Sequence, residues 1–337
     1  MREFQFNLFD FSRFRSELMG SATLLIILCH ATKYDLGMPS WLFTILGNGG
    51  AGVDIFLFLS GLGIFNSYTN SENNGIPVYK WFWRRYVRII IPCAFFIIPL
   101  TVLEYTQSSL GEIDFCGILL NLSGFGFLFG KGALWFVTCI LFLYFITPMI
   151  NKLLKGKNKY LYASILSFIS LLLGYVYFSD NIMAYKLQFM LCRFPSYFIG
   201  YAIAKEIRDQ HHVAIWKLVL VPFLGYILFF MLNRCLNAHF SLFWLQGIFL
   251  TSVIALLLKN TIVTKVLPLL RLLGSMSLES YATNILIMPL FFVKDFELWV
   301  MAPNIGKWCS YVVGTLICLA MSYVVNKLSK NIIKRIA

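Results

Sequence analysis

The chain has 337 residues, of which 59% are hydrophobic and 13% are charged, and its mean hydropathy is +0.76. This composition excludes an ordinary soluble domain and is typical of a protein that lies largely inside a bilayer. The formal net charge of +13 would suit a nucleic-acid-binding protein. The positions of the basic residues, described below, exclude that interpretation.

Ten stretches of the chain are apolar and long enough to cross about 30 Å of hydrocarbon, which takes about 17–25 helical residues. The sequence therefore predicts an all-α fold, a polytopic membrane helix bundle of about ten transmembrane helices that forms a single integral-membrane domain over 1–337. We expect short cytoplasmic termini at 1–17 and 327–337. In chain order the stretches are 18–34, 49–67, 88–105, 133–150, 160–178, 187–204, 213–232, 241–258, 276–293 and 307–326.

Lysine and arginine gather in alternate connections between these stretches. If the N-terminus is cytoplasmic, the inner segments hold most of the 28 basic residues. The positive-inside rule then predicts that both termini are cytoplasmic, N-in and C-in. The basic excess thus indicates membrane topology and contact with anionic lipid, and nucleic acid is not an expected partner.

Segment 115–130 is an apolar stretch inside a long connection. Counting it as a further span would invert every later loop and place the basic segment 152–159 outside. We therefore interpret it as a re-entrant or interfacial piece on the outer side. The eight cysteines show no spacing typical of metal ligands, so we expect apolar packing roles for them and no metal.

Three ionisable side chains, His30, Asp54 and Arg193, fall inside apolar stretches and at similar depth towards the outer face. Such residues are costly in a membrane and mark functional sites. A carboxylate beside His30 would fix its tautomer and make it a general base. The alternative is a hydrogen-bond network between helices. Asp54 has two predicted partners: His30, which we favour because the first two spans form a hairpin, or Arg193, in an architectural ion pair.

The segment 81–88 carries Arg84, Arg85 and Arg88 at the inner start of the third stretch. Arg85 and Arg88 share a helix face, and arginine forks bind phosphates in bidentate fashion. The neighbouring aromatic residues fit two interpretations: they stack on a nucleotide base, or they form an interfacial belt.

These segments resemble, in order, motifs of the acyltransferase-3 family of bacterial integral-membrane acyltransferases. The resemblance runs nearly end to end. It includes the family's first-helix histidine, its second-helix signature and its arginine pair before the third helix. The matching segments are His30, Gly50–Gly61, Arg84–Arg88, Leu134–Phe136 with Tyr144, Arg193–Gly200 and Leu273–Tyr281.

The resemblance implies an enzyme of the bacterial cytoplasmic membrane. It would move an acyl group, with acetyl as the default, from cytoplasmic acyl-CoA to a hydroxyl of a cell-surface or lipid-linked glycan. For this reaction we assign catalysis to the three residues of the polar layer, His30, Asp54 and Arg193. The resemblance assigns acyl-CoA binding to a further set of side chains: Arg84, Arg85, Arg88, Trp135 and Tyr144.

Two positions depart from the family pattern. Met19 stands where the family has an arginine, with Arg15 one turn away, and Asn284 stands where it often has a histidine. These departures leave open a catalytically idle scaffold. A transporter or exporter of a small anion or lipid-linked sugar, which would use the same polar layer, also stays open. Oligomerisation also stays open.

Overall fold

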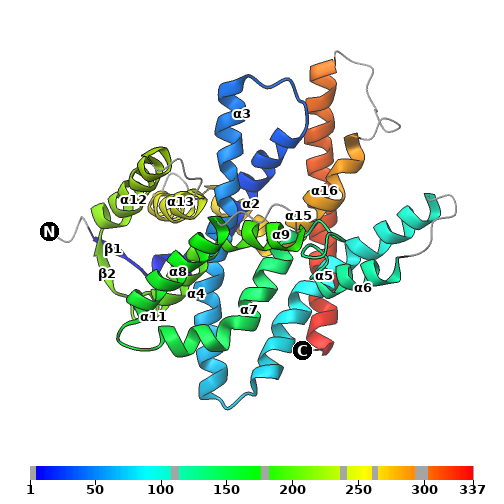
Figure 1. Cartoon of the computed structure of the whole chain (residues 1–337). Coiled ribbons are helices and arrows are strands. Elements are labelled where there is room, and N and C mark those ends of the chain that lie inside the picture. The colour runs from blue at the N-terminus through cyan, green and yellow to red at the C-terminus, as the bar shows by residue number, and fades with distance from the viewer. Residues whose placement is uncertain are drawn as a thin grey trace. The chain divides into compact units, whose positions relative to one another are not determined.

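The computed structural model describes residues 5–107, 114–175, 182–235, 241–259, 265–292 and 303–336 (Figure 1). Across these residues the fold is helical, except for one antiparallel pair of short strands, β1 (Gln5–Asn7) and β2 (His212–Ala214). Phe6 lies opposite Val213 in this pair. The predicted all-α fold is confirmed.

The contacts divide the chain into two compact units, each built from segments that alternate along the sequence. Unit 1 comprises Met1–Leu24, Gly50–Val78 and Leu143–Ser275. Unit 2 comprises Leu25–Gly49, Tyr79–Phe142 and Met276–Ala337. The single domain stays a prediction.

Unit 1 is organised around the buried helix α4 (Gly52–Asn73), against which α10 (Phe194–Ala202) packs. Glycines make this approach close: a Cβ at Gly61 would meet the carbonyl oxygen of Tyr197, and one at Gly200 would meet that of Phe58. The other helices of unit 1 are α1 (Asp10–Arg13), α8 (Lys159–Tyr175), α9 (Ile182–Leu191), α11 (Ala204–Arg208), α12 (Ile215–Cys235), α13 (Phe243–Leu258) and α14 (Leu267–Ser275). Of these, α8, α11 and α13 pack on the pair of α4 and α10.

Unit 2 contains most of α5 (Val78–Gln107), together with α6 (Phe115–Ser123), α15 (Ser277–Leu286), the 3-10 helix η5 (Met288–Phe292) and α16 (Pro303–Ile336). It also holds α3 (Ser40–Gly47) and the 3-10 helix η2 (Ala31–Lys33). α15 and η5 pack on α16. Two further helices contribute residues to both units: α2 (Arg15–His30) and α7 (Trp135–Leu154).

Segment 115–130 does not form a full span. Its helix α6 has nine residues, about 14 Å at 1.5 Å per residue, and it ends at Gly124 with φ +84°. Asp114 caps the helix by accepting the backbone N–H of Gly117 at 2.8 Å. Lys131 donates to the same carboxylate at 2.7 Å and holds the pKa of Asp114 below its usual value. The side of the membrane on which this piece lies stays a prediction.

Five stretches of the described chain are helical, long and apolar enough to cross a membrane. Helices α8 and α13 are apolar but shorter. The chain is thus a multi-pass membrane protein, whereas the count of about ten spans and the N-in, C-in orientation stay predictions. The five stretches are Ser40–Asn73, Val78–Leu103, Trp135–Leu154, Ile215–Cys235 and Gly306–Ile336.

The predicted span 187–204 is not one helix. It is interrupted between α9 and α10 at Cys192 and Arg193. Pro195 lies in the first turn of α10, where its missing N–H costs nothing and its fixed φ favours a helix start. This interruption places Arg193 at a helix end instead of inside a continuous helix.

The contact between α4 and α10 generates a stability prediction. Gly200→Ala forces a Cβ onto the Phe58 carbonyl oxygen, and backbone cannot rotate away as a side chain can. We expect a loss of about 1–3 kcal/mol, seen as a lower thermal unfolding midpoint of the purified protein. Gly47→Ala is the matched control, because its Cβ would meet nothing within 4 Å. Equal midpoints for the two variants would contradict the close packing.

Candidate functional site

Unit 1 contains a buried ion pair between Asp54 and Arg193. Nη1 of Arg193 donates to Oδ2 of Asp54, and the Ser196 hydroxyl donates to Oδ1 at 2.9 Å. Asp54 is fully buried and Arg193 is 6% exposed. A charge without water needs a charged or hydrogen-bonding partner, and this arrangement supplies one to each residue inside unit 1.

Local sequence explains how the pair is positioned. Asp54 lies in the first turn of α4, where the helix dipole favours a carboxylate. Arg193 precedes the first residue of α10. Gly247 on α13 lies against Asp54, with no room for a Cβ. Four residues earlier on α13, the Phe243 ring covers the guanidinium, with its centroid 4.1 Å from Cζ.

The predicted partner of Asp54 is therefore corrected. The structure has the Arg193 ion pair, and the favoured alternative, Asp54 orienting His30, is not the arrangement found. A guanidinium carries a full charge and a fork of donors, so it satisfies a buried carboxylate better than a neutral imidazole does. Ser196 was missed, although its spacing of three residues from Arg193 places both on one face of a helical turn.

One donor of this cluster stays available. The Nε of Arg193 is buried and has no hydrogen-bond partner in the part of the chain that the structure describes. Nη1 makes the contact with Asp54 and a long one of 3.4 Å with the Gly50 carbonyl. The guanidinium is thus held in place by one edge while Nε–H remains unpaired.

In unit 2, His30 is the last residue of α2 and is 9% exposed. Its Nδ1 contacts Oδ1 of Asn284, which comes from α15. In the neutral tautomer with Nδ1 protonated, the carboxamide oxygen accepts from Nδ1 and Nε2 keeps its lone pair. That tautomer is the one that a general base at Nε2 needs. Asn284, a departure from the family pattern, supplies the orientation that was predicted for Asp54.

Aromatic residues form a wall near the same helix end. The Tyr311 hydroxyl donates to the carbonyl of Ile27, one of the last carbonyls of α2, which helix ends leave without a partner. Tyr34 stacks on Phe292 with centroids 4.0 Å apart, and lies 5.7 Å from the Tyr311 ring. This wall makes the surroundings of the C-terminal end of α2 largely apolar.

Two motif segments far apart in the sequence meet in unit 2. The backbone N–H of Phe136, at the start of α7, donates to the Tyr281 hydroxyl at 3.0 Å, and the two rings meet edge to face. That N–H is one of the four that a helix start leaves unpaired. Trp135 packs edge to face on Phe136. Its predicted companion Tyr144 belongs to unit 1.

The three arginines of α5 differ in exposure. Arg84 and Arg88 are exposed, whereas Arg85 is half-buried. Arg84 and Arg88 are four residues apart and therefore share one helix face. Neither has an acidic partner within the described ranges. Two uncommitted guanidinium groups on one face suit a phosphate-bearing ligand.

The aromatic residues beside these arginines also differ in exposure. Trp81 is 3% exposed and belongs to the core of unit 2. Trp83 is 51% exposed and stacks on Tyr86, with ring centroids 5.9 Å apart. Both earlier interpretations, base stacking and an interfacial belt, therefore apply only to Trp83 and Tyr86.

Arg15, the residue nearest to the family's missing arginine, packs against α4. Its Nη2 donates to the Leu59 carbonyl at 3.3 Å, and Gly63 leaves space for the guanidinium. Met19 is half-buried on the same helix. Among the described residues, no group of three or more His, Cys, Asp or Glu side chains could hold a metal ion.

Comparison with known proteins gives one match. A family model described as an acyltransferase domain, of the acyltransferase-3 type, matches residues 20–327. Neither the comparison with curated proteins nor that with solved structures gives a match.

The buried pair generates a prediction. Asp54→Asn preserves the shape of the side chain but leaves Arg193 buried with its charge uncompensated. We expect a loss of about 3–5 kcal/mol of stability, measured by thermal unfolding of the purified protein. Glu72→Gln is the matched control, because it breaks an ion pair with Lys155 whose side chains are 43% and 59% exposed. Such a pair contributes about 0–1 kcal/mol.

If the two variants unfold at the same temperature, the Asp54–Arg193 pair does not hold unit 1 together. Arg193→Lys gives a further check. It keeps the charge but loses the fork, so its unfolding midpoint should fall between those of wild type and Asp54→Asn.

Proposed function

The chain belongs to the acyltransferase-3 family, and from this premise we propose that it transfers an acyl group, most simply acetyl, from cytoplasmic acyl-CoA to a hydroxyl of a cell-surface or lipid-linked glycan. The family match establishes a membrane acyltransferase. Donor, acceptor and the roles of single residues are our proposal.

The observation that carries the proposal is the contact between His30 and Asn284. It suits the tautomer in which Nδ1 of His30 donates to the amide oxygen and Nε2 is unprotonated. In the proposed reaction, Nε2 takes the proton from the acceptor hydroxyl as that oxygen attacks the thioester carbonyl. The new C–O bond forms, the C–S bond breaks, and the proton passes from the imidazolium to the CoA thiolate. A transient acyl-histidine is the alternative route that the same residue supports.

Asp54 and Arg193 take a separate part in the proposal. Asp54 fixes Arg193, whose unpaired Nε–H is a donor for the oxygen of a bound acyl group. In this proposal Asp54 is a positioning residue, since it acts through Arg193. The test is Arg193→Lys, which should lower kcat more than it raises KM.

Acyl-CoA binding is proposed for the exposed face of α5. Arg84 and Arg88 would hold the phosphates, with Arg85 beside them and the Trp83–Tyr86 stack available to the adenine. Trp135 and Tyr144 stay candidates for the acyl-bearing end of the donor.

Transport of a small anion is the weaker proposal. A helix interrupted at a buried arginine resembles the anion sites of some transporters. However, the charge of Arg193 is already compensated by Asp54, so it offers no net positive charge to a free anion.

We predict that His30→Ala abolishes acyl transfer and leaves the fold intact. General-base catalysis contributes roughly 10²- to 10⁴-fold, so kcat should fall by at least the lower of these factors. Release of the CoA thiol and acylation of the acceptor glycan, measured with the purified protein in vesicles, check this. His212→Ala, at an exposed histidine, is the control. Wild-type turnover by His30→Ala would contradict the base assignment.

We predict that Arg84→Ala and Arg88→Ala weaken acyl-CoA binding. Each removes a charge-assisted contact worth about 1.5–3 kcal/mol, or roughly 10- to 150-fold in affinity. KM for acyl-CoA should rise by that factor while kcat changes less. Lys334→Ala removes an exposed positive charge from another helix and should change neither constant. If neither Arg84→Ala nor Arg88→Ala changes KM for acyl-CoA, these arginines do not bind acyl-CoA, and their positive charges serve only the membrane topology.

A further inference from the structure

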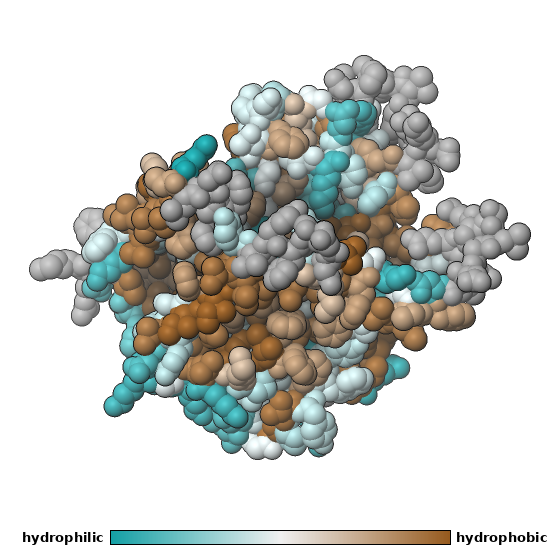
Figure 2. Space-filling view, viewed as in Figure 1, coloured by the Kyte–Doolittle hydropathy of each residue, from teal (hydrophilic) through white to brown (hydrophobic). Residues whose placement is uncertain are grey.

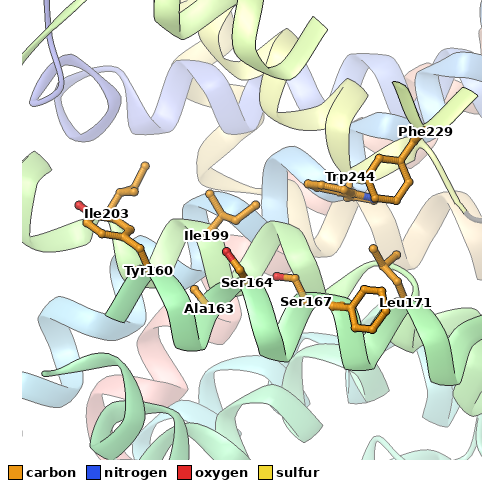
Figure 3. Close-up of a pocket in the computed structure, with 11 residues that line it drawn as sticks. Tyr160, Ala163, Ser164, Ser167, Leu171, Ile199, Ile203, Phe229 and Trp244 are labelled. Carbon is orange, nitrogen blue, oxygen red and sulfur yellow. The ribbon is translucent and has the colours of Figure 1, made fainter. Parts of the chain in front are cut away.

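Unit 1 contains a cavity of about 250 Å³ beside α8. It is lined by side chains of α8, α10, α12 and α13. Figure 3 shows Tyr160 at one end and Phe229 with Trp244 at the other, with Ser164 and Ser167 on the helix between them. The remaining lining is aliphatic or aromatic, so the cavity is an apolar groove with a few polar atoms.

Two of these polar atoms have no partner. The hydroxyl of Ser167 and the indole Nε1 of Trp244 are both buried, and neither makes a hydrogen bond within the described part of the chain. Ser167 is 8% exposed. Buried polar groups without partners are rare and call for an explanation. Because an indole N–H only donates and a hydroxyl can donate, a ligand that satisfies both must offer an acceptor oxygen.

The charges near the groove exclude an anionic group as that acceptor. At the Tyr160 end, Lys159 donates to both carboxylate oxygens of Glu206, at 2.6 and 2.8 Å. These two charges compensate each other, and the residues that line the groove carry none. A phosphate or carboxylate would therefore be desolvated without a cation. A neutral carbonyl oxygen meets the requirement.

The groove opens on an apolar surface. Four side chains of α8, namely Leu161, Ile165, Phe168 and Leu172, are 43–65% exposed. Figure 2 shows a largely hydrophobic surface where Figure 1 places this helix. Exposed apolar area of this kind in a membrane protein faces lipid. The lining is mostly apolar, so it suits a hydrocarbon chain better than a sugar or a nucleotide, whose many polar groups would be left without partners.

We propose that this groove binds one acyl chain of an ester-linked membrane phospholipid. The chain lies along α8 between Ile199 and Phe229, and the ester carbonyl accepts hydrogen bonds from the Ser167 hydroxyl and from Nε1 of Trp244. The site is independent of the acyl-transfer reaction, since none of its residues belongs to the proposed catalytic or CoA-binding groups.

The test compares two phosphatidylethanolamine probes in vesicles that contain the purified protein. Both carry a photoreactive diazirine at mid-chain; one is ester-linked and the other is the matching ether lipid, which lacks the carbonyl. Each lost hydrogen bond weakens binding by roughly 2- to 12-fold. We expect the ester probe to label peptides of α8 and α13. This labelling should be at least about twofold stronger than that by the ether probe.

Variants test whether the labelling depends on the groove and on its two hydrogen-bond donors. The double variant Ser167→Ala with Trp244→Phe keeps the shape of the groove and should label equally with both probes. Ser164→Phe places a ring in the groove from an exposed position and should abolish the labelling of α8 and α13. Ser170→Ala and Trp216→Phe are the controls, because Ser170 bonds its own helix and neither residue lines the groove.

Two results would overturn the proposal. Labelling that Ser164→Phe does not reduce would show ordinary surface lipid only. Equal labelling of wild type by the ester and ether probes would show that Ser167 and Trp244 do not bind a carbonyl.

Discussion

The arrangement of unit 1 depends on the cost of holding a carboxylate where water is absent. Asp54 is fully buried, so its charge must be compensated within the bundle. Arg193 provides that charge only because the helix is interrupted before α10, which brings the guanidinium to a helix end beside the start of α4. Glycines at 61, 200 and 247 allow the surrounding helices to approach this pair closely. The interruption before α10, the close packing of the helices and the Asp54–Arg193 ion pair therefore depend on one another.

Unit 2 differs from unit 1 in that a buried ionisable residue, His30, is paired with a neutral amide instead of a charged group. An aspartate at this position would stabilise the charged imidazolium, whereas Asn284 accepts from Nδ1 without adding charge. In the proposed mechanism the ring is a neutral base with Nε2 available. Asn284 in place of the family histidine is compatible with that mechanism.

The sequence predicted the helical membrane fold and the family, because apolar length and ordered motifs are read directly along the chain. It also predicted that Asp54 needs a partner, but it favoured His30. Depth in the membrane can be estimated from a sequence, whereas rotation about each helix axis cannot, and rotation decides which side chains face each other. Pro195 is typical of a helix start, so the interruption before α10 could have been predicted from the sequence. The contact between Phe136 and Tyr281 joins positions 145 residues apart, and no local sequence pattern predicts it.

The tautomer of His30 is the centre of this account, and nitrogen NMR of histidine-labelled protein measures it directly, with His30→Gln used to assign the signals. The account predicts that at neutral pH Nδ1 of His30 is protonated and Nε2 is not, and that Asn284→Leu removes this preference. A ring protonated at Nε2 alone, or a charged ring at neutral pH, would contradict the role of His30 as the base.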